Sequence, residues 1–233
     1  FVTAHASGRF FGFVIGGLHP AAYGAELLVS TWDQNAGLYA VTPGVAVVED
    51  VAKEWLLELL DLPRDASVGF VTGGQMANFT CLAAARDAVL RQVGWDVESD
   101  GLHGAPKVNV VVKSEKHSTG ARALRYLGLG FSSATEVDCD DESRIDPAAL
   151  DATLRGLSGP TIICVESGNI NTGSFDPFAE VADLADANRG RGNPTWVHVD
   201  GAIGLWARAS RSHVEMTEGM ERLDSWSTEP TSS

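Results

Sequence analysis

The apolar positions along the chain follow two different periods, and each period predicts one kind of element. In residues 45–60 they recur at three- and four-residue steps, as on one face of a helix: Val48, Val51, Trp55, Leu56 and Leu59. Elsewhere short continuous apolar runs stand between polar segments, and Val110, Val111 and Val112 belong to one of them. Runs of this kind predict strands that are covered on both faces.

The same two patterns continue through the rest of the chain. They predict helices over residues 20–30, 45–60, 75–93, 118–127, 147–154 and 177–188. They predict strands over residues 67–72, 108–113, 133–139, 160–167 and 195–200. Asp146 and Asp176 each precede a proline where a helix begins, and we expect both to cap those helices. The alternation indicates the α/β class, with a mostly parallel sheet and helices on both faces.

Four features that can carry chemistry follow predicted strands. They are the glycine pair Gly73–Gly74, His117, the turn at residues 169–172 and Asp200. Ligands of parallel sheets bind beyond the carboxyl ends of the strands. We therefore expect these four features to meet at one edge of the sheet.

The glycine pair stands between a predicted strand and a predicted helix. Glycines let the backbone approach an anion, which the free N–H groups and the dipole of the helix then hold. The stretch is not a P-loop, because no Gly-Lys-Ser/Thr follows, and it has no GxGxxG pattern. An anion site and a plain tight turn both remain open.

The polar residues at the other strand ends can be interpreted as ordinary structural residues or, for His117 and Asp200, as chemical groups. His117 is either a surface residue at a helix start or a group that stacks on a ring or moves protons. Asn169 and Asn171 suit an ordinary turn. Asp200 pairs either with a metal ion, together with His198, or with a protonated ring nitrogen such as that of pyridoxal phosphate (PLP). No third metal ligand is apparent in the sequence.

Composition narrows the classes of partner. The chain has 233 residues, of which 44% are apolar and 21% charged, and its formal net charge is −14 at pH 7. A field of that sign repels nucleic acid and anionic membranes. No apolar run reaches the roughly 18 residues that a membrane-spanning helix needs. We expect neither nucleic acid nor a membrane as a partner.

The three cysteines and the N-terminus bear on location. Cys81, Cys139 and Cys164 are odd in number and far apart, which indicates small buried residues in a reducing compartment. The apolar start of the chain lacks the charged residues and cleavage site of a signal peptide. These observations predict a cytoplasmic protein.

Several stretches, taken together and in order, resemble one family. The sequence is similar to pyridoxal-phosphate-dependent decarboxylases of the group II type, related to aromatic-amino-acid and glutamate decarboxylases. Within that group it most resembles bacterial members often labelled as aspartate-aminotransferase-like. The matching stretches cover almost the whole chain: GRFFGFVIGG, WDQNAGLY, GFVTGGQMANFTCLAAAR, GWDVESDGL, KHSTGARALRYLGLG, GPTIICVESGNINTGSFDPFAEVADLA, WVHVDGAIGLWA and LDSWST.

The resemblance implies a fold, a cofactor and a reaction. The fold is the large domain of fold-type-I PLP-dependent transferases, the cofactor is pyridoxal 5′-phosphate, and the assembly is a homodimer. The reaction is decarboxylation of an amino acid, which makes the complete protein a carboxy-lyase. Two alternatives are another fold-type-I reaction, of the aminotransferase or aldolase type, and a catalytically inactive truncated homologue.

The resemblance also implies roles for single residues. Gly73, Gly74 and Gln75 hold the phosphate at a helix N-terminus. Asn169 and Asn171 stand in a cofactor-contacting turn where relatives often have Thr.

The remaining implied roles concern the ring and the substrate. His117 stacks on the pyridine ring near the reacting carbon, and Asp200 binds the protonated ring nitrogen, which makes these two the catalytic residues. Ala202 packs under the ring, and Ser225 begins the segment that leads to the Schiff-base lysine. The substrate pocket is expected to receive side chains from the start of the chain: Phe10, Phe11, Phe13 and Val14.

One departure from the family falls at the end of the chain. Relatives continue past Asp-Ser-Trp to a His-Lys pair, but here Thr231 and Ser232 stand at those positions, and a hydroxyl cannot form an imine. We therefore expect this chain to lack the Schiff-base lysine. The expected division is 1–45 as the N-terminal part with the entry to the substrate pocket, 46–228 as an incomplete PLP-binding domain, and 229–233 as a divergent tail. The C-terminal small domain is expected to be absent.

Overall fold

A computed structural model describes residues 9–10, 17–114, 118–130, 132 and 134–229. The chain divides into two compact units, one of residues 1–68 with 230–233 and the other of residues 69–229. The described part of the first unit holds two helices, α1 (Pro20–Trp32) and α2 (Pro43–Leu59). Both lie within two residues of the predicted bounds at each end. No residue of α1 is buried, and Leu57 is the one buried residue of α2.

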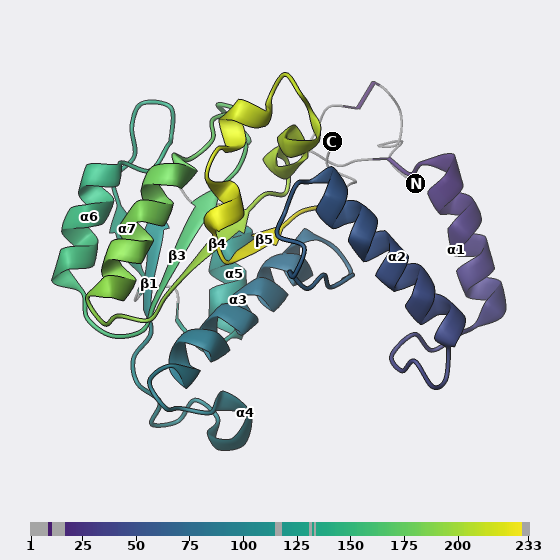
Figure 1. The fold of residues 1–233 in the computed structure, drawn as a ribbon, viewed down its shortest axis with the longest axis horizontal. Coiled ribbons are helices and arrows are strands. Elements are labelled where there is room, and N and C mark those ends of the chain that lie inside the picture. The colour runs from purple at the N-terminus through teal and green to yellow at the C-terminus, as the bar shows by residue number, and fades with distance from the viewer. Residues whose placement is uncertain (1–8, 11–16, 115–117, 131, 133, 230–233) are drawn as a thin grey trace. The chain divides into compact units, whose positions relative to one another are not determined.

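The second unit is built on a parallel sheet of five strands (Figure 1). In chain order the strands are β1 (Asn109–Lys113), β2 (Thr135–Val137), β3 (Thr161–Glu166), β4 (Thr195–Asp200) and β5 (Ser225–Ser227). Their order across the sheet is β2-β1-β3-β4-β5, and each neighbouring pair is parallel. The register aligns Glu166 with Asp200, and Asp200 with Ser227. The carboxyl ends of β3, β4 and β5 therefore lie side by side.

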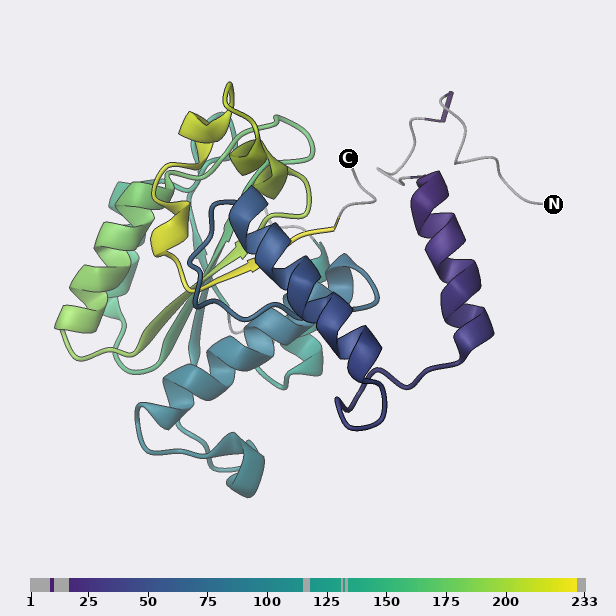
Figure 2. The ribbon, with the colours of Figure 1, turned by 45° about the vertical axis from the view of Figure 1, so that its right-hand side comes forward.

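Helices cover both faces of this sheet, as predicted (Figure 2). One face carries α3 (Gly74–Arg91) and α5 (Ser118–Tyr126), and the other carries α6 (Pro147–Gly156) and α7 (Phe178–Gly190). The remaining short elements are α4 (Val97–Asp100), η1 (Gly204–Ala209), η2 (Val214–Thr217) and η3 (Met220–Arg222). Asp146 caps α6 as expected, because its Oδ1 accepts from the backbone N–H of Ala148 at 2.8 Å.

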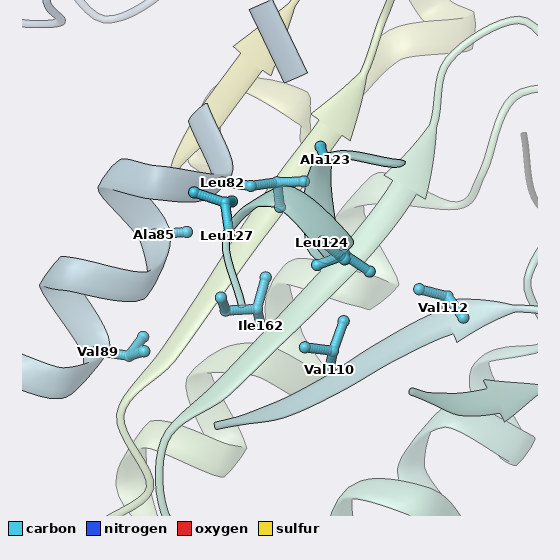
Figure 3. Packing of buried hydrophobic residues seen from close by; sticks show 9 residues of the cluster. All are labelled: Leu82, Ala85, Val89, Val110, Val112, Ala123, Leu124, Leu127 and Ile162. Carbon is cyan, nitrogen blue, oxygen red and sulfur yellow. The ribbon is translucent and has the colours of Figure 1, made fainter. Parts of the chain in front are cut away.

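A buried apolar cluster joins the sheet to α3 and α5 (Figure 3). Leu82, Ala85 and Val89 point from α3 towards the strands, and Leu124 points from α5. The sheet contributes alternate residues of β1 together with Ile162 of β3. All five residues of β1 are buried, because the sheet is covered on both faces. The cluster fixes the start of α3 above the carboxyl ends of the strands.

Two expectations about local structure are wrong. Residues 67–72 form no strand, and Phe70 and Val71 are 47% and 41% exposed. A strand needs a ladder partner, and the sheet's pairings include none for these residues. The cysteines are free thiols of intermediate exposure rather than fully buried residues.

Among the described residues, no helix is long and apolar enough to cross a membrane.

Candidate functional site

Asp200 lies on the wall of a small cavity at the carboxyl ends of the strands. The cavity measures about 60 Å³, and Asp200 and His198 reach it from β4 because side chains two residues apart share a face of a strand. Polar or thiol groups come from three other elements: Asn78 of α3, Lys113 of β1, and Cys164 and Glu166 of β3. Of the four strand-end features that were expected to meet, Asp200 lines this cavity, whereas Gly73, Gly74 and residues 169–172 are not among its lining residues. His117 lies outside the described residues.

Two N–H groups hold the carboxylate of Asp200. Oδ2 accepts from Nδ2 of Asn78 at 3.0 Å, and Oδ1 accepts from the backbone N–H of Ala202 at 3.3 Å. One donor comes from α3 and the other from the loop that follows β4. Because the two donors act on different oxygens, the plane of the carboxylate is fixed.

His198 is buried below this carboxylate, at 2% exposure. Its Nε2 lies 2.8 Å from Oδ1 of Asn78, and its Nδ1 lies 3.0 Å from Oγ of Ser225. Burial lowers the pKa of His198 to about 4, so the ring is neutral at pH 7. Among the described residues, no group of three or more His, Cys, Asp and Glu side chains could hold a metal ion. The metal interpretation of His198 with Asp200 therefore finds no third ligand there.

The start of α3 holds a carboxylate. Gly73 has φ of +122°, which favours glycine, and the backbone N–H of Gly74 donates to Oε2 of Glu229 at 2.9 Å. A Cβ added at Gly74 would lie 3.0 Å from that oxygen. An anionic group thus sits at the helix N-terminus, where the glycine pair predicted an anion site. Sequence reasoning missed Glu229, because 155 residues separate the two partners.

Lys113 forms a buried ion cluster that the sequence analysis also missed. Its Nζ lies 2.7 Å from Oε2 of Glu166 and 3.7 Å from Oδ1 of Asp176, and it donates to the carbonyl of Ser143 at 2.9 Å. Burial by itself lowers the pKa of Lys113, but the two carboxylates outweigh it and raise the pKa. The amine is therefore protonated and paired.

Asp176 does not cap α7, contrary to the prediction. Its Oδ1 accepts from the backbone N–H of Ile145 at 2.8 Å, and its Oδ2 accepts from that of Glu166 at 2.6 Å. The residue before α7 is Pro177, which makes no side-chain cap. Burial raises the pKa of Asp176, and the charge of Lys113 opposes that rise. The side chain turns back to the sheet because the paired cation lies there.

The turn after β3 is held by its own side chain. Oδ1 of Asn169 accepts from the backbone N–H groups of Asn171 at 2.9 Å and Thr172 at 3.1 Å. Its Nδ2 donates to Oε2 of Glu166 at 3.1 Å. These contacts are turn chemistry, as the residue pattern predicted. Asn169 reaches the cavity through Glu166 rather than directly.

Comparison with known proteins assigns the family. The profile of the "Pyridoxal-dependent decarboxylase conserved domain" matches residues 1–232. The chain belongs to this family. Human "Acidic amino acid decarboxylase GADL1" is 26% identical over 221 residues, which are 93% of this chain and 40% of that protein.

Solved structures of family members share the fold. Mouse CSAD is 26% identical with a TM-score of 0.83, over 95% of this chain and 45% of that one. Oryza sativa TDC, solved with PLP, is 30% identical with a TM-score of 0.81, over 99% of this chain and 50% of that one. The chain therefore spans about half the length of the relatives it matches. The expected fold class, the large domain of fold-type-I PLP-dependent transferases, is confirmed.

Several predicted site residues of this decarboxylase family member lie outside the described residues. They are His117, expected on the ring face, and three residues expected in the substrate pocket: Phe11, Phe13 and Val14. Thr231 and Ser232, which were expected at the positions of the family's His and Lys, lie outside as well. The cofactor contacts of the described candidates stay predictions.

Proposed function

We propose that this chain is the cofactor-binding part of a PLP-dependent amino-acid decarboxylase. The observation that carries the proposal is the Asp200 carboxylate, held on the wall of a strand-end cavity by Asn78 and by the backbone of Ala202. Family membership over residues 1–232 supports the same chemistry. The proposed substrate is an amino acid, from which a carboxy-lyase releases CO2.

The residues present fit the cofactor. The N–H of Gly74 already binds a carboxylate, so the same donor suits a phosphate, with Gly73 and Gln75 beside it. Asp200 faces the ring nitrogen in this proposal, and Ala202 lies under the ring. When bound, PLP withdraws electrons from the substrate's α-carbon, provided that its ring nitrogen keeps a proton.

Each candidate residue then has a definite task in this proposal. Asp200 keeps the proton on the ring nitrogen, because an anion beside that nitrogen favours its charged form. Ser225 holds the start of β5 through its contact with His198. Asn169 shapes the turn beside Glu166, and Asn171 follows it. His117 is proposed for the ring face, and Phe11, Phe13 and Val14 for the substrate pocket.

Binding of PLP to the chain itself tests the proposal. We expect Asp200→Ala to weaken PLP binding about tenfold or more, since it removes a charge-assisted hydrogen bond. Equilibrium dialysis measures the affinity. Asp151→Asn is the matched control, because Asp151 lies on α6 and pairs with Arg155. Equal affinities of the parent chain and Asp200→Ala would contradict the assigned role.

A catalytically inactive homologue is the second candidate function. Ser232 favours it, because a hydroxyl at the lysine position cannot form an imine. Borohydride reduction in the presence of one equivalent of PLP, followed by intact mass measurement, tests this point. We expect no stoichiometric adduct. An adduct on a single lysine would show that the chain carries a cofactor-binding amine after all.

The proposed assembly is a homodimer in the cytoplasm. Large apolar side chains stand exposed on α1 and α2, among them Trp32, Val48 and Trp55. Surfaces of this kind mark interaction sites. We propose that a second copy of the chain covers them, with residues 1–45 leading to the substrate pocket and 46–228 binding the cofactor. The three free thiols suit a reducing compartment.

A further inference from the structure

We propose that Asn78 and His198 are positioning residues that aim the Asp200 carboxylate at the cofactor. They do so through a relay of hydrogen bonds that starts at Trp196 and passes through Ser225. The inference rests on the proposed function, because it deepens the role of Asp200 in that site. No residue of the relay besides Asp200 contacts the cofactor in this proposal.

The chemistry of the partners fixes the direction of every bond. A carboxylate accepts only, so the amide nitrogen of Asn78 faces Asp200 and its oxygen faces His198. That oxygen cannot donate, so Nε2 of His198 carries the proton. Nδ1 of His198 then accepts the hydroxyl proton of Ser225. The Ser225 oxygen in turn accepts from Nε1 of Trp196 at 2.8 Å.

A second donor locks the amide of Asn78. The hydroxyl of Ser227 donates to Oδ1 of Asn78 at 2.7 Å, next to the bond from His198. Both lone pairs of that oxygen are therefore used, and Asn78 itself is buried. A flip of the amide would place its oxygen against the Asp200 carboxylate, which are two acceptors with no proton between them. Satisfied buried networks of this kind hold a single arrangement.

The hydrogen bonds of the relay also connect three elements of the fold. Asn78 belongs to α3, His198 and Asp200 to β4, and Ser225 to β5. The start of α3 is the proposed phosphate-binding site, and β5 leads to the segment where the family has its lysine. The relay thus sets the distance between the two ends of the cofactor site. A group fixed in advance needs no reorganisation when the ligand arrives.

The contact between Asp200 and the ring nitrogen can be measured by comparing two ligands. One is PLP and the other is 1-deaza-PLP, whose ring nitrogen is replaced by carbon. We expect the parent chain to prefer PLP about tenfold or more, as a charge-assisted hydrogen bond predicts. Asn78→Leu should reduce that preference to about threefold or less and change the affinity for the deaza analogue little.

Asn109→Leu is the matched control. Asn109 is a buried asparagine at the other end of β1, and it donates to the carbonyl of Ser158 at 2.8 Å. This variant should keep the full preference for PLP. If the parent chain prefers neither ligand, the proposed role of Asp200 fails. If the parent prefers PLP and Asn78→Leu does so equally, the relay is overturned while the proposed function stands.

A second pair of variants covers the case in which Asn78→Leu does not fold. His198→Leu should lose the preference for PLP, and His198→Gln should retain most of it, because its amide can donate to Asn78. A residue with a merely structural role would not show this rescue. Nitrogen NMR of the parent chain needs neither ligand nor variant. We expect His198 as the neutral Nε2–H tautomer, and an Nδ1–H or charged ring would overturn the relay.

Discussion

At the scale of single residues, charge that is buried (Lys113) or half-buried (Asp200) is the feature that organises the second unit. Asp200 and Lys113 both line the strand-end cavity, and each meets partners that come from other elements. Burial of a charge is costly unless partners compensate it. The partners of these two residues therefore decide how stability responds to mutation and to pH.

The neutral state of His198 predicts a loss of stability in acid. Its pKa is about 4 in the folded chain against 6.5 as its ordinary value, so the unfolded chain binds more protons between these limits. Stability contributed by the neutral ring is complete above pH 6.5 and falls as pH decreases towards 4. We expect about 2 kcal/mol of unfolding free energy to be lost between pH 7 and pH 5.

Urea unfolding at both pH values measures this loss. Carboxylates also titrate in the window, so the comparison is with His198→Gln, which should lose about 2 kcal/mol less between the two pH values. His213→Gln is the control, because His213 is exposed. An identical pH response of the parent chain and His198→Gln would contradict the prediction.

Replacement of Lys113 is expected to be strongly destabilising. Lys113→Met leaves the buried Asp176 and the half-buried Glu166 without their cation, at a cost of about 3–5 kcal/mol. Lys107→Met, at an exposed position, should change stability by less than about 0.5 kcal/mol. Urea unfolding at pH 7 compares the two. A loss below about 1 kcal/mol for Lys113→Met would show that the ion cluster contributes little.

At the scale of elements, hydrophobic periodicity predicted most helices and strands of the second unit. It succeeded for α3 and β4 because their apolar positions face a core that lies on the expected side. It failed for residues 67–72, where an apolar run has no ladder partner in the described sheet. Periodicity reports burial, whereas a strand also requires a neighbouring strand.

The N-terminus of α3 supports a prediction about anion binding. Glu229 occupies the N–H of Gly74, so a phosphate has to displace it and is repelled by its charge. We expect Glu229→Gln to bind PLP about 3- to 10-fold more tightly than the parent chain, since one unfavourable charge is removed. Fluorescence titration with PLP measures the change.

Two controls separate this effect from a general change of charge. Glu180→Gln removes an exposed carboxylate from the first turn of α7 and should leave the affinity unchanged. Titration with pyridoxal, which has no phosphate, should show the same affinity for the parent chain and Glu229→Gln. If Glu229→Gln also gained the same affinity for pyridoxal, the effect would not come from the proposed phosphate site at the start of α3.

At the scale of the whole molecule, net charge and exposed apolar surface act in opposite directions. The charge of −14 keeps copies apart, whereas the apolar side chains of α1 and α2 favour association. Val48 and Trp55 are 67% and 70% exposed, although they lie on the apolar face that predicted α2. A face of this kind needs a cover, and the described residues of the unit that contains α2 do not provide one.

Association of the chain should therefore depend on α2. We expect light scattering with size exclusion to give twice the chain mass of 24.6 kDa. A variant with both Val48→Ser and Trp55→Ser should shift the equilibrium to the monomer, because it removes apolar contact area. Val93→Ser, which changes an exposed valine of the other unit, is the control. A monomeric parent chain would contradict the proposed homodimer.

The sequence by itself determined the α/β class, the order of most elements and the family. Each of these depends on neighbouring residues or on stretches read in order, so local patterns carry the information. The tertiary structure alone decided which residues meet at the site. Asn78 reaches Asp200 across 122 residues, and Glu229 reaches Gly74 across 155. Such pairs follow from the order of the strands across the sheet, and the period of apolar residues along the chain does not encode that order.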